Sequence, residues 1–139
     1  MIWNNCLLFY KIGIYPMQTI NLTSFPCLGK EAQLQSLNNL VDISDSLMPH
    51  QIAVATGCSI DEALAVLLLL LRLSTVKGFL LVYHSGHEDN NPPIMARNIF
   101  DGLPILPFIC EVCQKEIINA NELSYDFLFK LIEKVHFGG

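Results

Sequence analysis

The chain has 139 residues, of which 52% are hydrophobic and 15% are charged, and its formal net charge is −5. This length suits one domain, and so large an apolar content excludes intrinsic disorder. The longest strictly apolar run covers residues 63–71, whereas a helix needs about 20 apolar residues to span a membrane. Because the few cations are scattered, we expect neither nucleic acid nor an anionic membrane as a partner.

Residues 1–29 are interpreted as an N-terminal arm. Residues 1–16 are mainly apolar and are uncharged apart from Lys11, but they lack the basic region and the small-residue cleavage site of a signal peptide. Met17 is therefore an alternative start to Met1. Residues 18–29 contain the breakers Pro26 and Gly29 and are expected to be extended or turn-rich.

The cysteines do not resemble a secreted disulfide framework, because their number is odd and they are widely spaced. They are Cys6, Cys27, Cys58, Cys110 and Cys113. We therefore expect a protein of the reducing cytoplasm.

Helical periodicity begins after residue 29, where the N-terminal segment ends. Leucines and other apolar residues recur every three or four positions over residues 30–47, which predicts an amphipathic helix. Pro49 then stands where the first residue of a helix is expected, and Gly57 stands where a helix ends. A second, short helix over residues 50–56 follows from these two signals.

A third helix is predicted over residues 60–76. Ser59 and Glu62 form the S-x-x-E capping box that starts a helix, and Lys77-Gly78 suits a helix end. A strand over residues 79–83 comes next. Residues 123–137 fit a strand and a helix about equally; we favour a strand that ends in a short helical turn.

Residues 49–84, PHQIAVATGCSIDEALAVLLLLLRLSTVKGFLLVYH, resemble the winged helix-turn-helix superfamily. Ala53 and Gly57 occupy the small-residue and turn-glycine positions of such motifs, and the resemblance extends to residues 30–84 if the first helix is included. It implies an α+β fold, with a winged-helix-like three-helix core and a small β wing. Residues 85–139 would form a C-terminal β/loop segment that carries a metal knuckle and packs on the core, so that the chain is one structural unit.

The third helix is the main argument against DNA binding. In DNA-binding members of the superfamily this helix enters the major groove, where polar side chains read the bases. Here both faces are apolar: the expected core stripe is Ile60, Leu64, Leu67, Leu68 and Leu71. The opposite face is covered either by the rest of the chain or by another subunit. The second case predicts a homo-oligomer or protein-partner interface at Leu69, Arg72, Leu73 and Val76.

One group of residues has the spacing of metal ligands. His84 and His87 form H-x2-H, and Cys110 and Cys113 form C-x2-C. Imidazole and thiolate are ligands that zinc prefers, so the two pairs predict a tetrahedral structural zinc site. The cysteine pair is similar to half of a zinc ribbon, although it lacks the accompanying glycine or proline. Cys27 or Cys58 is an alternative to one histidine, and buried thiols with plain loop histidines are the alternative to any metal.

The sequence favours a non-catalytic protein-interaction or oligomerisation module. The common catalytic motifs are absent, and the setting of a thioredoxin-like C-x-x-C is missing. Cys110 with His84 could also be drawn as a nucleophile and its base, but the same atoms suit a metal better. The alternative function is a winged-helix transcription regulator that contacts DNA through Arg72 and Lys77; a metal hydrolase is a more distant third.

Overall fold

The computed structural model describes residues 18–85 and 92–138. The predictions about His87 and about Met17 as a start therefore lie outside the described residues. The helices are α2 (Glu31–Ile43), α3 (Pro49–Thr56) and α4 (Ile60–Arg72). The longer strands are β1 (Gln18–Asn21), β3 (Val76–His84), β4 (Met95–Asn98), β7 (Leu123–Leu131) and β8 (Val135–Gly138). The two-residue strands are β2 (Ser46–Leu47), β5 (Phe108–Ile109) and β6 (Glu116–Ile117). Short 3-10 helices lie at η1 (Pro26–Leu28), η2 (Ile99–Asp101) and η3 (Ala120–Glu122).

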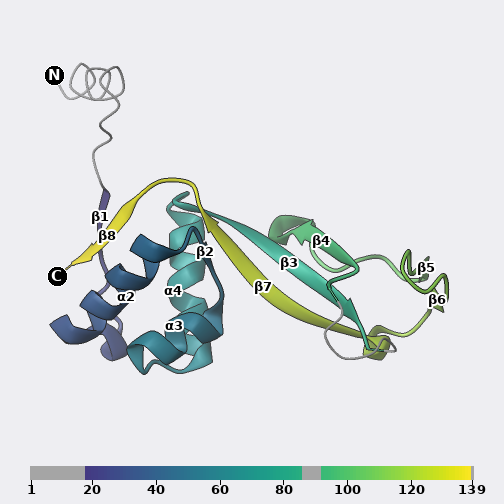
Figure 1. Ribbon diagram of the computed structural model, residues 1–139, viewed down its shortest axis with the longest axis horizontal. Helices are drawn as coiled ribbons and strands as arrows, with labels where there is room; N and C mark the ends of the chain where they lie inside the picture. Colours follow the sequence, from purple (N-terminus) through teal and green to yellow (C-terminus); the bar gives the residue numbers. More distant parts are fainter. Residues whose placement is uncertain (1–17, 86–91, 139) are drawn as a thin grey trace, which may run out of the picture.

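The expected α+β class is confirmed, and the molecule is elongated. Figure 1 shows the three α-helices at one end and the long β3–β7 ribbon running away from them toward β4, β5 and β6. We call the two parts the helical end and the arm, the arm being residues 92–122 with the adjoining ends of β3 and β7. The segment after residue 84 had been expected to pack on the core. The arm instead extends away from the helical end (Figure 1).

α4 begins where its capping box predicts. The Ser59 hydroxyl accepts from the Glu62 amide at 3.1 Å, and the Glu62 carboxylate accepts from the Ser59 amide at 3.1 Å. The helix ends at Arg72 and not at residue 76. Ser74 adopts φ 60° and Thr75 turns its amide and hydroxyl back to the Leu70 carbonyl, which closes the last turn early.

The sheet joins sequence-distant parts of the chain. Its order is β2-β7-β3-β4, with all neighbours antiparallel. β3 and β7 pair along their whole length, since Val76 faces Leu131 at one end and His84 faces Leu123 at the other. The predicted strand in the C-terminal segment is thus confirmed, and it belongs to the core sheet. In place of the expected helical turn, β8 follows and pairs in parallel with β1.

Two apolar clusters stabilise the molecule. The larger fills the helical end, where residues from all three helices pack with both ends of the described chain. The smaller lies in the arm and consists of Leu80, Val82, Cys110, Ile117 and Leu123. β3 contributes to both clusters, because one face of its alternating pattern is buried from Val76 to His84.

The core face of α4 differs from the expected stripe. Ile60 is 60% exposed and Leu68 is 43% exposed, and the buried residues are Ala63, Val66, Leu67 and Leu70. The buried face is rotated relative to the stripe expected from the leucine spacing. Its centre includes the smaller side chains of Ala63 and Val66, which leucine spacing does not identify. α4 therefore keeps an apolar exposed face.

Cys27 and Cys58 form a disulfide across 31 positions. This corrects the expectation of reduced thiols for these two residues, and it removes both as alternative metal ligands. Such bonds are rare in the cytosol, so this pair does not favour the predicted cytoplasmic location.

Within the described segments, each helix taken singly is too short or too polar to cross a membrane. Only α3 and α4 together reach the required length and composition, and the chain bends by 116° between them.

Candidate metal centre

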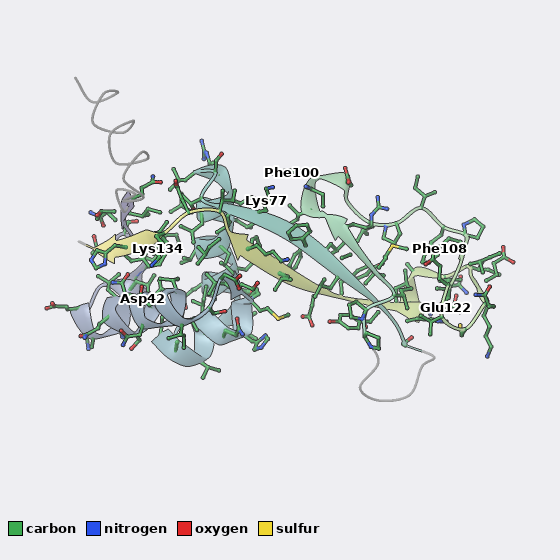
Figure 2. The ribbon with its side chains drawn as sticks, turned by 45° about the horizontal axis from the view of Figure 1, so that its top comes forward. Asp42, Lys77, Phe100, Phe108, Glu122 and Lys134 are labelled. Carbon is green, nitrogen blue, oxygen red and sulfur yellow. A yellow bond between two sulfur atoms is a disulfide. The ribbon has the colours of Figure 1, made fainter. Side chains whose placement is uncertain are left out.

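Three predicted ligands meet at the far end of the arm. The imidazole of His84 and the sulfurs of Cys110 and Cys113 lie within 4.8 Å of one another. His84 Nδ1 is 3.5 Å from the Cys113 sulfur. Figure 2 shows this end of the molecule, with Phe108 and Glu122 far from Asp42 on α2. The fourth predicted ligand, His87, is outside the described residues.

A tight turn presents the two cysteines. β5 and β6 pair through Phe108 with Ile117 and Ile109 with Glu116, and the turn between them runs from Cys110 to Lys115. The Cys110 amide donates to the Lys115 carbonyl at 2.9 Å, and the Gln114 amide donates to the Cys110 carbonyl at 2.8 Å. Gln114 adopts φ 63°, a left-handed conformation usual for glycine. The turn thus forms although the glycine is missing from the sequence.

His84 reaches the turn because of strand alternation. It is the last residue of β3 and lies on the same buried face as Leu80 and Val82, with 8% of its surface exposed. Those leucine and valine side chains pack in the arm cluster with Cys110. The His84 imidazole therefore lies at the end of this buried face, close to the two sulfurs.

The environment of Cys110 favours the thiolate form. Burial by itself would raise the pKa of this fully buried thiol, but hydrogen bonds from the Cys113 and Val112 amides and from the Cys113 side chain outweigh it. The resulting pKa lies below the ordinary value of 9.0. A thiolate is the form that binds a metal ion.

Glu122 holds the loop behind His84. Its carboxylate accepts from the amides of Ile118 and Asn119, both at 3.0 Å. These amides, with Asn119 first, hold the pKa of Glu122 below 4.5, and the nearby His84 adds to the effect. The Glu122 carbonyl accepts from both the amide and the hydroxyl of Ser85, the residue after His84. Glu122 thereby joins the end of β3 to the segment that follows β6.

The three clustered side chains are separate from a neighbouring cavity. A hollow of about 280 Å³ lies beside β4 and β5 with Ile105, Phe108 and Ile109 in its wall, but none of the three clustered ligands lines it. Cys110 as a nucleophile would also be fully buried.

The four predicted interface residues differ in how exposed they are. Arg72 is exposed, Leu73 is 44% exposed and Leu69 is partly buried against the core. Val76 is only 2% exposed, because it starts β3 and packs inward; it cannot belong to an exposed face. Lys77, the second predicted DNA contact, is exposed on the opposite face of β3.

Two features escaped the sequence interpretation. The Cys27–Cys58 pair had no signal in its spacing, and the left-handed turn at Gln114 had none in its residue type.

Comparison with protein-family models, with curated proteins and with solved structures gives no match to this chain.

Proposed function

We propose that the chain is a non-catalytic protein-interaction module of winged-helix type, whose arm is ordered by a structural zinc ion and which self-associates through α4. The order of elements supports the fold: α2, β2, α3, α4 and β3 follow one another, and β7, which comes after residues 92–122, lies between β2 and β3 in the sheet. Gly57, at φ 80°, forms the turn between α3 and α4. The arm would then be a wing lengthened by residues 92–122.

The main support for a zinc site is the cluster of His84, Cys110 and Cys113. Two thiolates and one imidazole match the donors of structural zinc sites, which are tetrahedral. We assign the fourth position to His87 on the H-x2-H spacing. The arm has few buried residues and two-residue strands, so a metal would supply order that apolar packing alone gives only weakly.

Elemental analysis of the purified chain tests the zinc site. We expect one zinc ion per chain, lost in His84→Ala and in Cys113→Ala. His136→Ala is the matched control, because this histidine is exposed on β8 at the other end of the molecule. His87→Ala should weaken zinc binding and alter the absorption spectrum of the cobalt-substituted protein, because it removes the proposed fourth ligand. A wild-type chain without zinc, purified in its presence, would refute the site.

The exposed face of α4 supports self-association. Leu68 on α4 and Leu73 directly after it are 43% and 44% exposed, the other face of this helix is buried, and Ala65 and Arg72 are also exposed. Exposed apolar patches of this kind usually mark contacts with other molecules. Arg72 adds the residue type that is enriched in interfaces.

Leu73→Glu tests this placement by sedimentation or light scattering. We expect the wild-type chain to be oligomeric and the variant to be a folded monomer, because a carboxylate is costly to bury in an apolar interface. Ile105→Glu is the control, since Ile105 is 85% exposed and belongs to the arm, not to the helical end. A monomeric wild type, or an oligomeric folded variant, would refute self-association through α4.

DNA binding is the second candidate function because two lysines with like charge lie side by side on the sheet. Lys77 lies directly opposite Lys130 on β3 and β7, and like charges in this position are unfavourable without an anion. The Lys130 ammonium group also lies 5.9 Å from the centre of the Phe79 ring. Binding to duplex DNA that weakens with salt, and further in Arg72→Ala and Lys77→Ala, would favour this candidate; no binding at low salt would exclude it.

A further inference from the structure

The segment before α2 crosses the helical end and is fastened at two places. We call residues 18–29 the strap; it contains β1 and η1. Ile20, Leu22 and Leu28 bury their side chains in the same cluster as residues of the three helices. β1 pairs with β8 over four residues at one end of the strap, and Cys27 bonds to Cys58 at the other.

Apart from its buried apolar residues and the disulfide, the strap is held by weak elements. A two-stranded pairing of this length is only marginally stable without other support. In the part of the chain that the structure describes, the side-chain hydrogen bonds of the strap remain within it, since both join Thr23 to Asn21. Apolar burial and the Cys27–Cys58 bond therefore carry its attachment.

The two cysteines differ in their surroundings. Cys58 is 5% exposed in the turn between α3 and α4. Thr56 fixes this turn, because its hydroxyl donates to the Ile52 carbonyl at 2.6 Å and accepts from the Cys58 amide at 3.2 Å. Cys27 lies in the short η1 and is partly exposed. The turn is thus the fixed side of the bond, and the strap is the side that can move.

We propose that the Cys27–Cys58 disulfide is a redox latch that holds the strap on the helical end. A cellular dithiol, attacking through its thiolate, would form a mixed disulfide and then its own disulfide. Cys27 and Cys58 would be released as two thiols, with two electrons passing from the dithiol to this pair. Opening the strap would uncover the apolar residues of α2 and β8 that share its core. The inference is independent of the proposed zinc site and of self-association.

Hydrogen exchange on the Cys27→Ala/Cys58→Ala variant tests the latch without any reductant that could disturb the arm. We expect residues 18–29 and their partner β8 to exchange at least about tenfold faster than in the wild type, with α4 unchanged. Wild-type chain treated with a dithiol should behave in the same way, and the variant should not respond to it. Unchanged exchange in the strap would overturn the proposal. So would an equal increase over all three helices, because the bond would then stabilise the whole core and not the strap.

Alkylation of the reduced wild-type chain gives a second measurement that needs no variant to fold. The latch predicts that Cys27 is modified at least about tenfold faster than Cys58 under native conditions, because the strap leaves while the turn stays folded. Equal rates for the two thiols, or no reaction at Cys27, would also overturn the proposal.

Discussion

The Nδ1 atom of His84 lies 3.5 Å from the sulfur of Cys113, although 29 positions separate the two residues. This contact joins the end of β3 to the turn between β5 and β6. Among the described residues, the small arm cluster and the hydrogen bonds from Ser85 to the Glu122 carbonyl also connect this region. A metal ion at this point would therefore act mainly on the order of the arm.

Removal of the metal should loosen the arm selectively. With a chelator, we expect residues 108–117 to exchange their amide hydrogens at least about tenfold faster, while the helices keep their protection. The helical end should be insensitive because the buried residues of its larger core are different from those of the arm cluster. Hydrogen exchange read by mass spectrometry would measure both parts in one sample, with chelator-treated His84→Ala as the control that has no metal to lose. Equal protection of residues 108–117 with and without chelator would contradict a structural role for the ion.

Local signals made part of the fold predictable. The start of α4 follows from Ser59 and Glu62, whose capping bonds involve only neighbouring residues. The end of α4 could not be predicted, because it depends on Ser74 in a left-handed conformation that serine rarely adopts.

The candidate metal ligands were predicted from the sequence as two pairs of one site, but the contact that brings three of them together could not be predicted. His84 and Cys110 meet only because β3 and the β5–β6 hairpin pack in one cluster, and no local pattern encodes that contact. The same reason explains why Cys27 and Cys58 were missed as a pair, since their contact depends on how the strap lies against the turn after α3. Contacts between distant segments are set by packing, which a single sequence does not display.

Gly78 is required where η2 packs on the sheet. A Cβ at this position would lie 2.9 Å from Ile99 Cγ2 and 3.3 Å from the fully buried Phe129 ring. The Ile99 side chain is branched at Cβ and cannot simply rotate away. We expect Gly78→Ala to lower the free energy of unfolding by about 1–2 kcal/mol, measured by urea denaturation. Gly138→Ala is the control, because its nearest neighbour would be 3.7 Å away; equal effects of the two changes would contradict the packing argument.

Asn38 attaches the C-terminal strand to α2. Its side-chain amide donates to the Phe137 carbonyl at 2.8 Å, and its side-chain carbonyl accepts from the Phe137 amide at 2.7 Å. Asn38→Ala leaves both backbone groups of Phe137 without these partners, so we expect a loss of about 2 kcal/mol in the free energy of unfolding. Asn39→Ala, on the exposed side of the same helix, should change it by less than about 0.5 kcal/mol. The two variants compared by urea denaturation decide the point, and a neutral Asn38→Ala would show that water replaces the side chain without cost.

The loop behind the metal centre should depend on pH through Glu122. Its pKa in the folded chain lies below 4.5, first because of the Asn119 amide and then the Ile118 amide, with His84 adding to both. A carboxyl group with a lowered pKa stabilises the fold fully above 4.5, and this contribution disappears as the pH falls through the lower, folded value. In metal-free protein, the amide NMR signals of Ile118 and Asn119 should therefore titrate with a midpoint below 4.5. The titration should vanish in Glu122→Gln and persist in Glu116→Gln, whose side chain is exposed on β6. A midpoint at or above 4.5 would mean that the carboxylate does not hold these two amides in solution.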